Sequence, residues 1–158
     1  MSLEVANENA DIGRDVETEI CSTVYPELER VTSDAGEPDW CDAFAVDPIG
    51  SIVPAGTPGE IKSCREWIVD GSSRRRGRWW FRKEPSRKLA IANGIVILVV
   101  RDDADSILRR SIVRASTVWA LLEERWTPTG DRHYAAASAQ LPWSAVYRSL
   151  DRPSGGEA

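Results

Sequence analysis

Six consecutive apolar residues at 95–100 (IVILVV) restrict most strongly what this chain can fold into. The run has the length of a strand and is far shorter than the roughly 20 residues that a membrane-spanning helix needs. No polar position alternates with the apolar ones, so both faces of the strand must be covered, as when helices pack on both sides of a sheet. The run therefore predicts an α/β fold. Because it is the longest apolar run of the chain, the sequence predicts no membrane partner.

Apolar spacing and Pro/Gly signals divide the rest of the chain. Its 158 residues have the length of a single domain, 1–158, without an internal repeat, and its ends at 1–10 and 152–158 are expected to be frayed. Helices are expected at 12–24, 84–92, 117–126 and 143–150, and strands at 41–46, 59–64, 78–82, 95–100 and 133–141. Residues 65–70 could prolong the second strand before a loop at 71–77, and residues 106–115 fit either helix or strand.

The net charge of −5 hides a strongly uneven charge distribution. Residues 1–60 hold 14 acidic and 2 basic side chains, whereas residues 61–88 hold 10 basic and 3 acidic ones. Residues 89–158 hold 8 of each sign. Because a polyanion responds to a local patch more than to the total charge, the basic stretch predicts a nucleic-acid partner.

The three cysteines, Cys21, Cys41 and Cys64, cannot all pair, and no CxxC spacing occurs. This pattern favours reduced thiols in a cytoplasmic protein and disfavours a zinc ribbon. The N-terminal MSLEVANENAD is acidic and has no apolar segment, so no secretory signal is expected. Arginine outnumbers lysine 17 to 3, which favours a GC-rich and salt-adapted source, archaeal or viral.

The triplet Glu60-Ile61-Lys62 is the most informative short motif, because it falls on an expected strand. Residues two apart on a strand share a face, so Glu60 and Lys62 should point the same way. Asp42 begins the preceding strand, and pairing of the two strands can bring its carboxylate beside Glu60. Two carboxylates this close repel each other unless a cation or a shared proton relieves them.

Such an all-oxygen pair is what Mg²⁺ or Mn²⁺ accepts, with several waters retained. Asp42 and Glu60 are therefore predicted metal ligands. Lys62 could orient the attacking water and stabilise charge on a phosphate. Glu17, on the first helix, could complete the metal shell.

In their order and context these residues resemble the PD-(D/E)xK nucleases, especially the archaeal Holliday-junction-resolvase branch. The glycine and glutamate of that branch's first helix match Gly13 and Glu17, the motif aspartate matches Asp42 in WCDAF, and the Glu-x-Lys matches Glu60 and Lys62. The succession GRWWFRKEPSRKL and then GIVILVV resembles the strand, basic helix and strand that complete such cores.

The resemblance implies a restriction-endonuclease-like core at 12–102, with a mixed central sheet flanked by helices, and an α+β C-terminal extension at 103–151. It also implies a metal-dependent DNA endonuclease whose catalytic residues are Glu17, Asp42, Glu60 and Lys62. Branched or junction DNA as substrate and a homodimeric state are further implications.

Two departures from the family pattern leave alternatives open. The interval between Asp42 and Glu60 is longer than in compact resolvases, so Asp39 and Asp47 are rivals for the metal-binding aspartate. The helix at 84–92 lacks the glutamine often found there in the family. Lys83, Arg87 or Lys88 would then have to take its DNA-contacting role.

The adjacent arginines of a Gly/Ser-containing loop form the second predicted site. Arg74, Arg75, Arg76 and Arg78 are expected to bind phosphates, since backbone contacts dominate nucleic-acid affinity. Trp79 and Trp80 should project to opposite faces of a strand, one into the core and the other free to stack on a base or to cap the basic patch.

Each feature also has a structural alternative. Glu60 and Lys62 could form an ordinary ion pair on an exposed strand, and Asp42 could be a turn residue. Glu17 could be a solvated helix residue, with Glu19 as its nearest rival. The arginines could be a solvated hairpin tip. The whole chain could also be an inactive nuclease-like fold that binds nucleic acid or protein.

Overall fold

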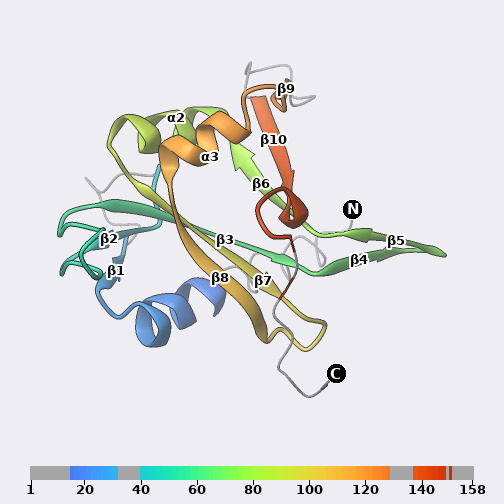
Figure 1. Ribbon diagram of the computed structural model, residues 1–158, viewed down its shortest axis with the longest axis horizontal. Helices are drawn as coiled ribbons and strands as arrows, with labels where there is room; N and C mark the ends of the chain where they lie inside the picture. Colours follow the sequence, from blue (N-terminus) through green and yellow to red (C-terminus); the bar gives the residue numbers. More distant parts are fainter. Residues whose placement is uncertain (1–14, 32–39, 129–136, 149, 151–158) are drawn as a thin grey trace.

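The computed structural model describes residues 15–31, 40–128, 137–148 and 150, and all statements below concern these residues (Figure 1). Several predictions fall outside them: the frayed ends, the start of the first helix at 12–14, and the residues 133–136 of the last expected strand. The rival metal ligand Asp39 also lies outside the described residues.

The central sheet has five strands in the order β1-β2-β3-β7-β8. Their bounds are Leu28–Arg30 for β1, Ala43–Ala45 for β2, Pro58–Arg65 for β3, Ile95–Arg101 for β7 and Ile107–Arg114 for β8. β3 and β7 are parallel, and the other neighbours are antiparallel. The predicted mixed sheet of an α/β fold is thus confirmed.

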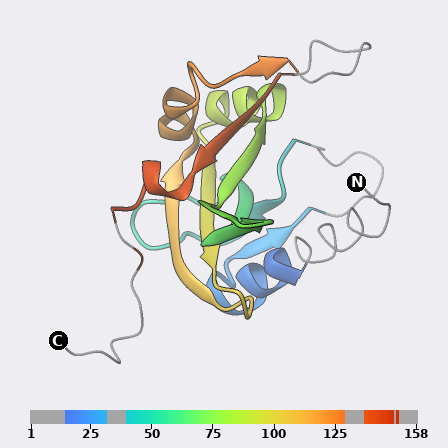
Figure 2. The ribbon, with the colours of Figure 1, turned by 90° about the vertical axis from the view of Figure 1, so that its right-hand side faces the viewer.

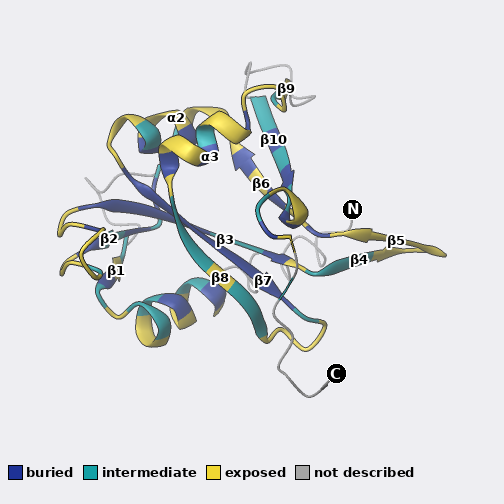
Figure 3. Cartoon of the chain, in the orientation of Figure 1, coloured by how far each residue is buried: buried dark blue, intermediate teal, exposed yellow. Residues whose placement is uncertain are grey.

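Both faces of β7 are covered, as its unbroken apolar run predicted. All its residues are buried, and Figure 3 shows the strand as a continuous buried band. Leu98 belongs to one hydrophobic core and Ile97 to the other, because neighbouring residues of a strand face opposite sides.

Helices cover the two faces of this sheet. Helices α2 (Lys83–Ile91) and α3 (Ala115–Leu121) contribute Leu89 and Val118 to the core that contains Leu98. A helical segment at 15–24, which ends as the π-helix η1 (Ile20–Val24), contributes Val16 and Ile20 to the core that contains Ile97. Figure 2 shows the two groups of helices on opposite sides of the sheet.

A second sheet crosses one end of the molecule in the order β6-β10-β9. It contains β6 (Arg78–Arg82), β10 (Ala137–Pro142) and β9 (Thr127–Pro128), and a short 3-10 helix, η2 (Trp143–Ala145), follows β10. The strand expected at 78–82 therefore exists but pairs with the C-terminal β10 instead of joining the central sheet. Its inward side chains, Trp79 and Phe81, fill the core between the two sheets.

The loop expected at 71–77 is instead half of a β-hairpin. Strands β4 (Trp67–Asp70) and β5 (Ser73–Arg76) pair with each other to form a projecting arm, which Figure 1 shows on the right. Gly71 allows the tight turn, since it has a positive φ of 60°. At the base of the arm a Cβ on Gly77 would lie 1.6 Å from the carbonyl oxygen of Arg65, so only glycine fits there.

The structure resolves one prediction that was left open and corrects two others. Residues 107–114 form a strand because the edge of β7 offers them an antiparallel partner. The helices expected at 117–126 and 143–150 are shorter, since α3 ends at Leu121 and η2 at Ala145. The short strand β1 was not predicted at all. Within the described part of the chain, no helix is long and apolar enough to cross a bilayer.

Candidate active site

Strand β3 carries the two central residues of the candidate active site. Glu60 and Lys62 share one face of the strand, as their spacing predicted, and Lys62 Nζ lies 2.9 Å from Glu60 Oε1. The side chain of Glu60 is only 12% exposed and that of Lys62 is 25% exposed. The ion pair therefore does not lie on an exposed strand, as the structural alternative had assumed.

Asp42 is held against β3 by backbone pairing. Its N–H donates to the carbonyl oxygen of Gly59 at 2.8 Å, and the N–H of Ile61 donates back to Asp42 Oδ2 at 2.8 Å. The carboxylate thus lies at the edge of β3 beside the backbone between Glu60 and Lys62. The rival Asp47, by contrast, is exposed in the loop after β2.

Burial makes negative charge costly at both carboxylates. It raises the pKa of Glu60, an effect that Lys62 partly offsets and that the charge of Asp42 reinforces. Burial also raises the pKa of Asp42, although the Ile61 N–H and the charge of Lys62 favour its ionised form. At both positions the effect of burial on the pKa exceeds what the nearby positive charges offset.

Glu17 reaches the same site from the helical segment at 15–24. Burial and then the charge of Asp42 raise its pKa, while Arg30 and Lys62 lower it. Its Oε2 accepts a hydrogen bond from Arg30 Nη2 at 3.0 Å. Glu19, its predicted rival, is exposed, so Glu17 is the glutamate that this helix brings to the site.

Two arginines at the site escaped the sequence-based prediction. Arg30 of β1 contacts Glu17 and also donates to Thr18 Oγ1 at 3.0 Å. Arg82, at the end of β6, lies near enough for its charge to lower the pKa of both Asp42 and Glu60. The alternation of exposed and buried residues along β6 could have identified Arg82, whereas Arg30 depends on the unpredicted strand β1.

A cleft of about 620 Å³ opens beside the site. Its lining includes Glu17 and Lys62, and basic side chains from three strands extend it toward the arm. These are Arg65, Arg78 and Arg101. Trp80 and Ile68 supply apolar surface to the same cleft. A site of buried carboxylates thus adjoins a basic and partly aromatic surface.

The predicted arginine cluster divides between the two faces of the arm. Arg74 and Arg76 lie over the ring of Trp67, with the guanidinium carbons 4.1 and 5.9 Å from its centroid. Arg75 pairs across the hairpin with Ile68, which lines the cleft. Because directly opposed residues share a face, Arg75 is the member of the trio that faces the cleft side.

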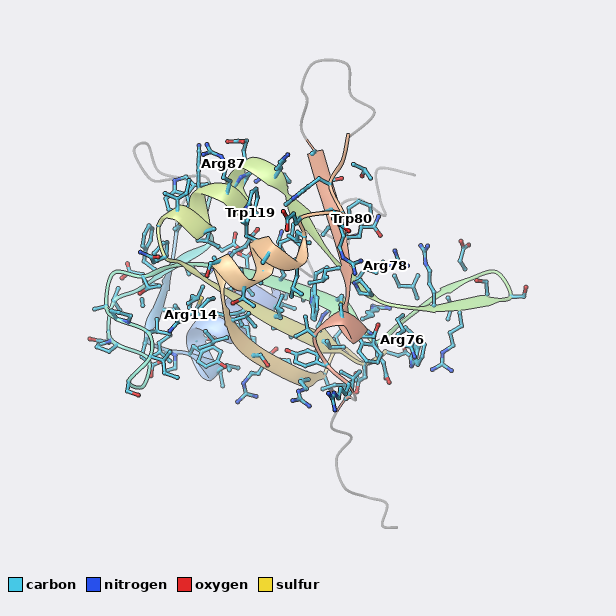
Figure 4. The ribbon with its side chains drawn as sticks, turned by 45° about the horizontal axis from the view of Figure 1, so that its top comes forward. Arg76, Arg78, Trp80, Arg87, Arg114 and Trp119 are labelled. Carbon is cyan, nitrogen blue, oxygen red and sulfur yellow. The ribbon has the colours of Figure 1, made fainter. Side chains whose placement is uncertain are left out.

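The basic residues of α2 lie apart from the cleft lining. Arg87 is paired with Glu84 at 3.0 Å, and Figure 4 shows it on α2, away from Arg76 and Arg78. Lys83 lines a separate pocket with Trp119 and Trp126. Contact of DNA with Lys83, Arg87 and Lys88 stays a prediction. None of these three residues lines the cleft.

The donors at the site suit a hard divalent cation, which prefers carboxylate oxygens and retained waters. Glu60 Oε2 is buried and has no hydrogen-bond partner among the described residues, so this oxygen could ligate a cation. In the same part of the chain, no three acidic, histidine or cysteine side chains gather closely enough to form a complete cage.

The sequence pattern of the PD-(D/E)XK nuclease superfamily domain matches residues 3–148, which is nearly the whole chain. The chain belongs to this superfamily. The match confirms the superfamily that Glu60, Lys62 and their context indicated, and the mixed sheet flanked by helices is consistent with its restriction-endonuclease-like fold. A comparison with curated proteins found no match.

The raised pKa of Asp42 predicts how stability of this PD-(D/E)XK domain depends on pH. The folded chain binds the proton of Asp42 more tightly than the unfolded chain does, so ionisation destabilises the fold as pH rises above about 4. In metal-free buffer, wild type should lose stability relative to Asp42→Asn between about pH 4 and pH 7.

Urea unfolding of both proteins at the two pH values, with EDTA present, measures this difference. Asparagine keeps an oxygen that can accept the Ile61 hydrogen bond, so it is a close control for the charge. A wild type that gains stability relative to Asp42→Asn as pH rises would contradict the assignment of a destabilised carboxylate.

Proposed function

We propose that the protein is a metal-dependent DNA endonuclease that hydrolyses phosphodiester bonds at the Asp42–Glu60–Lys62 site. The observation that carries the proposal is the buried Glu60 carboxylate, which has one oxygen bound to Lys62 and the other without a partner among the described residues. A structural ion pair does not need a second carboxylate beside it, and Asp42 is one, partly buried and close enough for its charge to raise the pKa of Glu60.

Asp42 and Glu60 would hold the ion, Mg²⁺ or Mn²⁺, and Glu17 would support its shell of waters. When bound, the ion supplies Lewis-acid stabilisation of the charge that develops on the phosphate. The present partner of Glu17 is Arg30, and their ion pair keeps the Glu17 carboxylate pointed at the site.

Lys62 would act on the reacting groups themselves. Its ammonium has three donors, of which one is used by Glu60. Another can hold the attacking water, and a further one can bind a non-bridging phosphate oxygen. In the reaction the water oxygen forms a bond to phosphorus, the bond to the leaving oxygen breaks, the water loses a proton and the leaving oxygen takes one.

DNA would approach along the basic cleft and the arm. Arg65 and Arg78 line the cleft beside Lys62, and Arg75 faces the same side from the arm. These side chains can neutralise phosphates in a manner that is independent of sequence. A preference for branched or junction DNA and a homodimeric state, which the resemblance to resolvases implies, are part of the proposal.

Loss of the Lys62 charge should abolish most of the activity. Lys62→Met and Glu60→Gln should each lower the cleavage rate by at least about 100-fold, as expected for a group that acts on the transition state. The exposed Glu123→Gln, matched in chemistry to Glu60→Gln, should cleave like wild type.

The measurement is the rate of cleavage of linear, nicked and four-way DNA with millimolar Mg²⁺, compared with EDTA. Equal rates for Lys62→Met and wild type would refute the mechanism. DNA binding by wild type without cleavage under any of these conditions would favour the inactive, nucleic-acid-binding alternative.

The two faces of the arm predict different effects of neighbouring arginines. Arg75→Ala should weaken duplex binding and reduce the slope of log affinity against log salt concentration by about 0.9, the loss of one phosphate contact. Arg74→Ala should have a smaller effect, because Arg74 rests on Trp67 on the opposite face. Fluorescence anisotropy over a series of salt concentrations separates the two, and an equal or larger effect of Arg74→Ala would be inconsistent with this assignment.

A further inference from the structure

Trp80 is an exposed indole beside the candidate active site. The two tryptophans of β6 point to opposite faces, as expected for neighbouring residues of a strand. Trp79 is fully buried and donates its Nε1–H to the carbonyl oxygen of Val99 at 3.0 Å. Trp80 is 58% exposed. A large aromatic side chain that is left in water is costly, so its position needs a reason.

Five of the other six tryptophans have an aromatic or cationic partner. Trp67 lies under Arg74 and meets the edge of Trp143, with the ring centroids 6.3 Å apart. Trp119 and Trp126 pack together at 5.5 Å. Within the residues that the structure describes, the indole of Trp80 stacks on no ring or cation. One of its faces is therefore available to a ligand.

The surroundings of Trp80 are cationic and adjoin the site. It lines the same cleft as Lys62 and Glu17. Arg78 and Arg82 precede and follow it by two residues on the exposed face of β6, and Arg82 is the arginine whose charge reaches Asp42 and Glu60. Figure 4 shows Arg78 and Trp80 on the side of the molecule from which the arm projects.

We propose that Trp80 is a stacking site for an unpaired nucleobase of the DNA strand that enters the cleft. An indole supplies a π-face to any base, and arginines on both sides can hold the adjoining phosphates. The bases of an intact duplex are stacked on each other, so only a single-stranded or locally unpaired segment can use the site. The inference rests on the proposed nuclease function and specifies its substrate class.

A protein partner is the alternative occupant of an exposed indole. Tryptophan and arginine are both enriched at protein interfaces, so these residue types alone do not decide between the two occupants. The cleft that Trp80 lines has Lys62 and three arginines against the single carboxylate of Glu17, and this charge suits a polyanion. The other strongly exposed apolar side chains, Ile52, Val69 and Ile91, do not line this cleft. The surroundings of Trp80 therefore favour a nucleic acid, which combines negative phosphates with aromatic bases.

The test compares binding of two dye-labelled single strands that differ only in their bases. One strand is an ordinary oligonucleotide, and the other is an abasic analogue of equal length and charge. Anisotropy is measured in EDTA for wild type, Trp80→Ala and Trp80→Phe, with the exposed Ile52→Ala as control. Circular dichroism establishes that each variant is folded.

Wild type should bind the ordinary strand more tightly than the abasic one. Trp80→Ala should lose about 5- to 100-fold of affinity for the ordinary strand, and little for the abasic strand. Trp80→Phe should keep most of the affinity because it keeps a ring, and Ile52→Ala should match wild type. The salt dependence should not change, since Trp80 carries no charge.

Equal affinities of wild type and Trp80→Ala for the ordinary strand would overturn the proposal. So would an equal loss for both strands, or a wild type that does not distinguish them. None of these results bears on the nuclease function, which is judged by Mg²⁺-dependent cleavage and its loss in Lys62→Met.

Discussion

The parallel pairing of β3 with β7 fixes the positions of Glu60 and Lys62, the two central residues of the candidate site. Seven residue pairs, from Gly59 with Ile95 to Arg65 with Arg101, hold β3 against a strand that is buried on both faces. Glu60 and Lys62 then share one face of β3, and the antiparallel start of β2 brings Asp42 to its edge. The carboxylates of Asp42 and Glu60 therefore have little freedom to move apart.

That rigidity has an energetic cost. Burial raises the pKa of three carboxylates in one place, and nearby cations reduce this effect without removing it. Arg30 holds Glu17, and Lys62 holds one oxygen of Glu60. Such perturbed groups cluster at functional sites more often than elsewhere, because catalytic groups need pKa values matched to their task. Under the proposed function, a divalent cation would offset part of the cost of burying these carboxylates.

The sequence was sufficient for those parts that depend on local periodicity. The run at 95–100 predicted a doubly covered strand, and the spacing of Glu60 and Lys62 predicted their shared face, because both follow from the two-residue repeat of a strand. The arm, β1 and the separate sheet of β6 were not predictable in this way. Strand β1 and the sheet of β6 each depend on a pairing partner farther along the chain, such as Pro142 for Arg78, and so does the contact of Arg30 with Glu17. The arm is a local hairpin, but no alternation of apolar residues marks its second strand, Ser73–Arg76.

The central claim is that the carboxylates of Asp42 and Glu60 form one cation site at the edge of β3. An anomalous difference map from crystals grown with Mn²⁺ tests it most directly, because it locates the ion without reference to activity. We expect a peak bonded to an oxygen of Asp42 and to an oxygen of Glu60, at about 2.0–2.2 Å as for a small hard cation. No peak there, or a peak bonded only to other residues, would contradict the account.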